Sequence, residues 1–282
     1  MIKMSKVKAI ICSVTAIVIL ILSQIVSELV AGLFLFAGVP TGVCNALAGV
    51  LYLAIALIIV KVFYEKVMHL ETADFGITKF SLNWKWIVAA LLLPVAVMAV
   101  YLLFIPGEYV AAEMSFGQKL GTVLTGIFFT GIGSGFVEEI VFRGVIFRSL
   151  EKAWNSKVGV IVPSVLFGVV HIIGMDFSLG SCLLVILAGT AVGVMFSLIT
   201  IESGSVWNNG LAHALWNIIV IGGVLTVGAQ ADENSIMSYV LNTKSFAITG
   251  GEFGIESSVI ALIGYIIVSV AAVLTIRKKK RV

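Results

Sequence analysis

Long apolar stretches alternate with short polar connections along most of this chain. A helix that crosses the hydrocarbon core of a bilayer needs roughly 17–25 mainly apolar residues. About eight stretches reach or approach that length, at 9–38, 42–63, 86–105, 119–148, 158–175, 179–200, 205–226 and 258–276. The pattern predicts an all-α, polytopic membrane protein of about eight transmembrane helices, with 1–282 forming a single integral membrane domain.

Composition supports the same class. Of the 282 residues, 60% are hydrophobic and 12% are charged, and the mean hydropathy is +1.14. A soluble domain of this size could not bury so much apolar surface. The first apolar stretch is much longer than the core of a signal peptide, so we expect an uncleaved first span. Cys12, Cys44 and Cys182 are widely spaced within apolar stretches and indicate neither a disulfide framework nor a metal site.

The basic residues are distributed unevenly over the predicted connections. With eight spans and a cytoplasmic N-terminus, 16 of the 18 lysines and arginines fall on the cytoplasmic side, and only Lys119 and Lys244 fall outside. The count of 16 includes Arg143, although the hydropathy pattern places this residue within a span. This bias follows the positive-inside rule and predicts that both termini are cytoplasmic, in what we expect to be a bacterial plasma membrane. It also accounts for the net charge of +3 without a nucleic-acid partner.

Two segments depart from the simple alternation. The fourth stretch is long, and its Gly131, Gly133 and Gly135 indicate a bend or a close helix contact. The longest polar stretch, 229–257, is predicted to lie outside as a lid or a connector.

Three charged side chains interrupt the fourth stretch, where FVEEIVFRG spans 136–144. A charge near the bilayer centre costs on the order of 2.5–3.5 kcal/mol, so such residues are candidates for function. Glu139 and Arg143 are four residues apart, which places them on one helix face as a favourable pair. Glu138 points elsewhere and has no local partner, so we expect it to contact another helix.

Two histidines inside apolar stretches could supply that contact. The connection between the fourth and fifth stretches centres between Trp154 and Asn155, and Glu138 and His171 are equally far from this midpoint. In an antiparallel hairpin they therefore reach the same depth. Asn217 follows His213 by four residues and shares its helix face.

These residue types suit the hydrolysis of an amide. A carboxylate beside an imidazole can hold and deprotonate a water molecule for attack on a carbonyl, as Glu138 and His171 would. A second imidazole and an amide can donate hydrogen bonds to the oxyanion that the attack creates, as His213 and Asn217 would.

The same residues resemble the motifs of a known family. EEIVFR, FGVVH and HALWN are similar to the EExxxR, FxxxH and HxxxN motifs of the CPBP (Abi) intramembrane proteases, which include CAAX prenyl proteases and bacterial proteins of bacteriocin processing and self-immunity. The resemblance covers about 120–225 and implies a catalytic core at 119–226, in predicted helices 4 to 7. It implies catalytic roles for Glu138, His171, His213 and Asn217, and supporting roles for Glu139, Arg143 and Phe167.

Three other functions are compatible with the sequence. Glu138, His171 and His213 could hold Zn²⁺ with an open position for water, although HExxH is absent. Intramembrane carboxylates and histidines also form proton relays in transporters, but the chain shows no inverted repeat. The polar cluster could instead hold together a peptide-binding or bacteriocin-immunity protein that needs no proteolysis. As a protease, the chain would act on peptide or protein substrates at the lipid bilayer.

Overall fold

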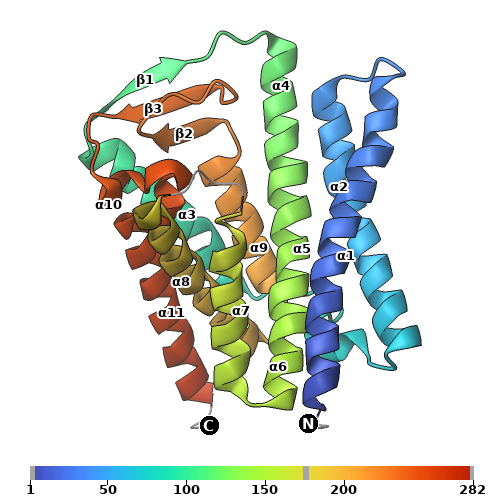
Figure 1. Cartoon of the computed structure of the whole chain (residues 1–282). Coiled ribbons are helices and arrows are strands. Elements are labelled where there is room, and N and C mark those ends of the chain that lie inside the picture. Colours follow the sequence, from blue (N-terminus) through green and yellow to red (C-terminus); the bar gives the residue numbers. More distant parts are fainter. Residues whose placement is uncertain (1–3, 174–177, 280–282) are drawn as a thin grey trace.

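The computed structural model describes residues 4–173 and 178–279, and most of them form long helices (Figure 1). Helices α1 (Lys6–Gly32), α2 (Thr41–Val62) and α3 (Trp84–Phe104) come first. One continuous helix follows, made of α4 (Phe116–Leu124), η4 (Thr125–Ser134), α5 (Gly135–Glu139), η5 (Ile140–Ile146) and α6 (Phe147–Ala153), of which η4 and η5 are wider π-helical turns. The remaining long elements are α7 (Ser156–Val170), α8 (Leu179–Ser203), α9 (Trp207–Trp216) with its π-helical extension η6 (Asn217–Ile221), and α11 (Val259–Lys279).

Each of the eight predicted stretches contains a helix, and the polytopic all-α class is confirmed. Within the described residues, six helices are long and apolar enough to cross a membrane. The other two are shorter than predicted: α7 has 15 residues, and α9 with η6 covers 207–221, so each is about 22 Å long. The end of the fifth stretch, at 174–175, lies outside the described residues, as do Lys3, Lys280 and Arg281.

The long α4–α6 helix stands between two groups of helices (Figure 1). On one side, α2 packs against η4, and α1 packs against α2, η5 and α6. On the other side, α7 packs along α8, and α8 packs along α11, while α9 contacts both α5 and α3. Apolar side chains such as Ile10, Val14, Ile263 and Ile267 are exposed on the outer helices, as expected for surfaces that contact lipid.

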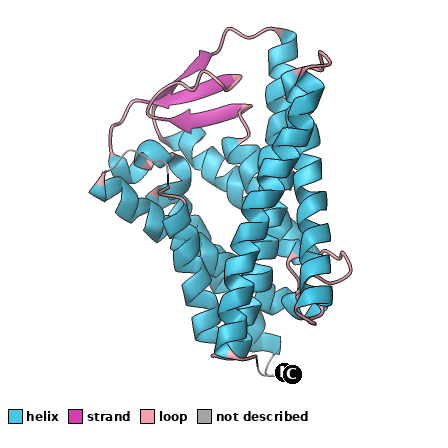
Figure 2. Cartoon of the chain, turned by 45° about the vertical axis from the view of Figure 1, so that its right-hand side comes forward, coloured by secondary structure: helices cyan, strands magenta, loops and turns pink. Residues whose placement is uncertain are grey.

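A small β-sheet lies at the end of the molecule away from the termini (Figures 1 and 2). Its strand order is β1 (Gly107–Ala111), β3 (Met237–Leu241), β2 (Leu225–Gly228), with β1 antiparallel and β2 parallel to β3. The sheet was not predicted from the sequence, because its strands have four or five residues and come from distant parts of the chain. The stretch 229–257 therefore contains β3, the short helix α10 (Phe246–Thr249) and two 3₁₀ turns, η7 (Gly251–Phe253) and η8 (Ile255–Ser257).

A buried carboxylate joins three helices at the end where the chain begins and ends. Glu202 of α8 accepts hydrogen bonds from Lys85 Nζ at 3.0 Å and from Trp86 Nε1 at 2.6 Å, both at the start of α3. Lys279, at the end of α11, places its Nζ 2.9 Å from the same carboxylate. This cluster ties together the helices that surround α9.

Glycines let the long helix approach its neighbours closely, in agreement with the close contact predicted for the fourth stretch. A Cβ atom on Gly135 would lie 2.7 Å from the backbone nitrogen of Ala214 in α9. Side-chain atoms do not tolerate such a distance to backbone, so α5 and α9 meet at this point only because residue 135 is glycine.

We expect Gly135→Ala to lower peptidase activity by at least tenfold, because it separates α5 from α9 and so moves Glu138 and Glu139 away from His213. The matched control is Gly117→Ala in α4, where an added Cβ meets no atom within 4 Å. Activity of both variants, measured after purification at equal folded amounts, checks this result. Equal activities of the two variants would contradict it.

Candidate active site

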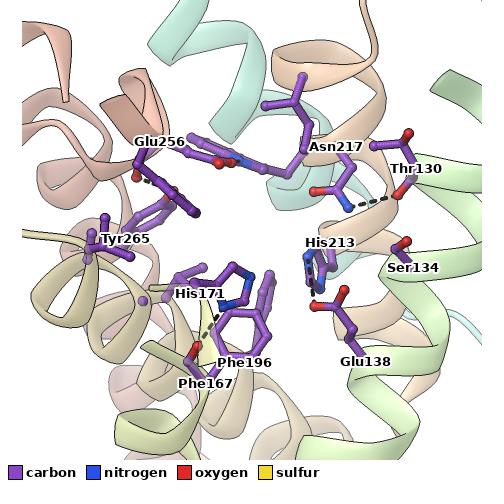
Figure 3. Close-up of a pocket in the computed structure, with 17 residues that line it drawn as sticks. Thr130, Ser134, Glu138, Phe167, His171, Phe196, His213, Asn217, Glu256 and Tyr265 are labelled. Atoms are coloured by element: carbon purple, nitrogen blue, oxygen red, sulfur yellow. Dashed lines mark hydrogen bonds and ion pairs between the residues drawn. The ribbon is translucent and has the colours of Figure 1, made fainter. Parts of the chain in front are cut away.

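A cavity of about 310 Å³ lies between the long helix, α7, α8, α9 and the segment that leads into α11 (Figure 3). It has room for about ten water molecules at roughly 30 Å³ each. The four residues predicted to be catalytic, Glu138, His171, His213 and Asn217, all line it. The structure therefore brings together side chains from three separate stretches of sequence.

The carboxylate of Glu138 faces this cavity. Its Oε2 lies 4.0 Å from His213 Nε2, and its side chain is partly exposed to the cavity. Within the described residues no shorter polar contact of this carboxylate is present. Glu138 can therefore accept a hydrogen bond from a water molecule in the cavity without breaking an existing one.

Glu139 is fully buried and organises the opposite side of His213. The predicted pair with Arg143 is present, with 2.7 Å between Arg143 Nη1 and Glu139 Oε1. The same oxygen lies 3.0 Å from His213 Nδ1, and Asn209 Nδ2 donates to Oε2 at 2.5 Å. Because Nδ1 of His213 faces a carboxylate, its Nε2 is directed toward Glu138 and the cavity (Figure 3).

Phe167 connects the ion pair to His171. The guanidinium carbon of Arg143 lies 4.3 Å from the centre of the Phe167 ring, and that ring packs 4.5 Å from the imidazole of His171. The carbonyl of Phe167 lies 2.6 Å from His171 Nδ1. A carbonyl oxygen can only accept, so Nδ1 carries the proton and the neutral ring keeps a lone pair on Nε2. This imidazole is therefore oriented as an acceptor for a water proton.

Asn217 lines the cavity one helical turn beyond His213. Its Nδ2 donates to the carbonyl of Thr130 at 2.8 Å, which holds the amide against the long helix. The amide carries two N–H groups, so one remains to donate to a group bound in the cavity.

Asn209 and Glu256 are among the polar residues of the site that were not found by sequence reasoning. Asn209 precedes His213 by four residues and so shares its face, a spacing that could have identified it. Glu256 lines the cavity but belongs to the polar stretch 229–257, where nothing in the pattern separates it from solvated residues.

The three residues proposed as metal ligands do not converge. Within residues 4–173 and 178–279, no group of three or more His, Cys, Asp or Glu side chains is arranged to hold a metal ion. The set Glu138, His171 and His213 thus does not fit a Zn²⁺ site, and the mechanism below contains no metal step.

We expect Asn209→Ala to lower kcat about tenfold, equivalent to about 1.4 kcal/mol in the barrier, with little change in KM. The variant removes a hydrogen bond that orients Glu139 and, through it, His213. The neighbouring Asn208→Ala is a matched control, because Asn208 is also buried but accepts from the backbone nitrogen of Asn83, away from the cavity. Steady-state kinetics of the two variants checks this expectation, and an equal loss of kcat in both would contradict it.

Comparison with known proteins agrees with the motifs. Residues 120–219 match a family model described as "Rce1-like: Type II CAAX prenyl endopeptidase Rce1-like", a region that contains every residue from Glu138 to Asn217 discussed above. No curated protein and no solved structure matches the chain. Residues 120–219, about a third of the chain, are thus similar to the type II CAAX prenyl endopeptidases, in agreement with the resemblance of the three motifs to CAAX-type intramembrane proteases.

Proposed function

We propose that this protein hydrolyses peptide bonds of membrane-associated peptides or proteins, using a water molecule activated by Glu138 and His171. One observation carries the proposal: Glu138, His171, His213 and Asn217 line one cavity enclosed by apolar helices. A carboxylate and an imidazole acceptor supply general base catalysis there, and the other two side chains supply hydrogen-bond donors.

The first step is attack of water on the scissile carbonyl. His171 Nε2 accepts a hydrogen bond from the water and holds it, while Glu138 takes one of its protons. The water oxygen forms a bond to the carbonyl carbon, and the carbonyl oxygen becomes an oxyanion. Asn217 and His213 then donate hydrogen bonds to this oxyanion. His213 donates from Nε2 when its ring carries a proton on both nitrogens. The carboxylate of Glu139, which faces Nδ1, balances the positive charge of that ring.

The second step breaks the C–N bond. Glu138 returns its proton to the leaving nitrogen, which departs as an amine, and the new carboxyl group stays on the other fragment. Glu138 is again a carboxylate at the end of the cycle, so no cofactor is consumed.

The location follows from the distribution of charge. We propose that the protein resides in a bacterial plasma membrane with both termini in the cytoplasm. This places the sheet on the outer side, together with Lys119 and Lys244, the two basic residues that the positive-inside rule leaves outside.

Mass spectrometry of protein and peptide termini tests this function directly. Membranes and medium are compared from cells that express the wild type or Glu138→Gln at matched levels. We expect termini that appear only with the wild type, and these identify the substrate and the cleaved bond together. Identical termini from two folded and equally abundant proteins would overturn proteolysis and favour a peptide-binding or bacteriocin-immunity role.

A further inference from the structure

Glu256 stands on the wall of the cavity opposite Glu138 (Figure 3). It belongs to η8, outside both the three motifs and the matched segment 120–219. Its side chain has one hydrogen bond, from Trp216 Nε1 at 3.4 Å, and the described residues provide no ion-pair partner for it. The cavity lining contains no lysine or arginine. Glu256 is thus a carboxylate without a lysine or arginine partner among the described residues, in the same cavity as the proposed catalytic side chains.

The segment that carries Glu256 is held in place by several contacts. Ser257 Oγ donates to the carbonyl of Gly250 at 2.7 Å, and Tyr265 Oη donates to the carbonyl of Glu256 at 3.0 Å. Gly250 and Gly254 adopt φ angles of 76° and 94°, which favour glycine, and they allow the tight turns around η7. The carboxylate is therefore positioned in the cavity by its backbone.

Aromatic rings flank this carboxylate. Trp216 and Tyr265 both line the cavity, and their ring centres lie 5.2 Å apart. Aromatic faces attract cations, and a carboxylate beside them adds a direct charge partner. Glu256, Trp216 and Tyr265 together have the chemistry of a site for a positively charged group.

The rest of the cavity suits the stem of a long basic side chain. Val185, Ala188 and Val192 of α8 contribute apolar surface to its lining. Lysine and arginine bury an apolar stem while their charged head contacts a polar group. A side chain of this kind matches both the apolar lining and the carboxylate.

We propose that Glu256, Trp216 and Tyr265 form a subsite for a lysine or arginine side chain of the substrate, close to the scissile bond. This assignment rests on the peptidase function proposed above and narrows its substrates to peptides with a basic residue at that position. Burial raises the pKa of the Glu256 carboxyl, and a bound cation opposes this effect by favouring the ionised form. Among the described residues that line the cavity there is no lysine or arginine, so the substrate would supply the permanent positive charge at this site.

A charge-swap experiment in lipid nanodiscs tests the subsite. The probes are acylated, fluorophore-labelled peptides of alanine and leucine that carry one central lysine, norleucine or glutamate. We expect the wild type to cleave the lysine peptide with a kcat/KM at least tenfold above that of the norleucine peptide. Glu256→Gln should lower kcat/KM for the lysine peptide to the value that the same variant shows for the norleucine peptide, and Glu256→Lys should favour the glutamate peptide. Glu252→Gln is the matched control, because Glu252 is exposed on the same segment and does not line the cavity.

A binding measurement separates this inference from the proposed function. In the Glu138→Gln background, fluorescence anisotropy should show at least tenfold tighter binding of the lysine peptide than of the norleucine peptide, lost on adding Glu256→Gln. Tighter lysine binding without cleavage by the wild type would keep the subsite and overturn proteolysis. Two results would overturn the subsite but not the proteolytic function. One is cleavage by the wild type without a preference for lysine. The other is an equal slowing of the cleavage of all peptides by Glu256→Gln.

Discussion

Replacing Glu138 with glutamine is expected to lower kcat by about a thousandfold, within the range that general acid–base groups contribute. Glutamine has the same shape but cannot take a proton from water or return one to the leaving amine. Its effect on folding should be small, because Glu138 makes no hydrogen bond to the described residues and its nearest polar neighbour, His213 Nε2, is 4.0 Å away. Single-turnover kinetics of the purified variant, together with its thermal unfolding midpoint, measures both effects.

A matched substitution separates the loss of the proposed general base from the general effect of removing one negative charge. Glu28→Gln removes a carboxylate from α1 that does not line the cavity; Glu28 is exposed and accepts from Gln24 Nε2 at 2.9 Å. We expect wild-type kinetics from it. The proposed role of Glu138 would be wrong if Glu138→Gln, folded and at equal concentration, kept more than a tenth of the wild-type kcat.

The convergence of the four proposed catalytic residues on one cavity could be predicted, because helical spacing and depth act over short distances in the sequence. Glu139 and Arg143 are one turn apart, and so are His213 and Asn217, so their shared faces follow from helix geometry alone. Glu138 and His171 lie in a hairpin with a short connection, which makes their depth predictable as well. All four proposed catalytic residues line the same cavity.

The remaining parts of the site depend on tertiary packing that a sequence pattern does not encode. Glu139 contacts His213 at 3.0 Å only because Gly135 lets α5 approach α9. Glu256 reaches the cavity through a turn whose course is set by glycine φ angles and by Tyr265 in the next helix. The sheet pairs residues as distant as Tyr109 and Tyr239. No periodicity or residue spacing in the sequence indicates these contacts.

The second large effect concerns the buried Glu139–Arg143 pair. We expect Arg143→Met to destabilise the protein by about 3–5 kcal/mol, because it leaves the fully buried Glu139 without its cation. The guanidinium also packs against Phe167 and Phe196, at 4.3 Å and 5.2 Å from their ring centres, so its loss loosens the contact of the long helix with α7 and α8. Thermal unfolding of the variant in nanodiscs should show a midpoint about 10 °C lower.

Two further variants test whether the buried charge causes this loss. Arg148→Met, one turn further along the same helix, removes an arginine whose pair with Glu151 is partly exposed, and it should cost less than about 1 kcal/mol. In the double variant Glu139→Gln/Arg143→Met the uncompensated charge is absent, so we expect it to be more stable than Arg143→Met alone, although it still lacks the aromatic contacts. If the double variant were no more stable than Arg143→Met, the uncompensated charge of Glu139 would not be the cause of the destabilisation. The lost contacts of Arg143 with the aromatic rings would then explain it.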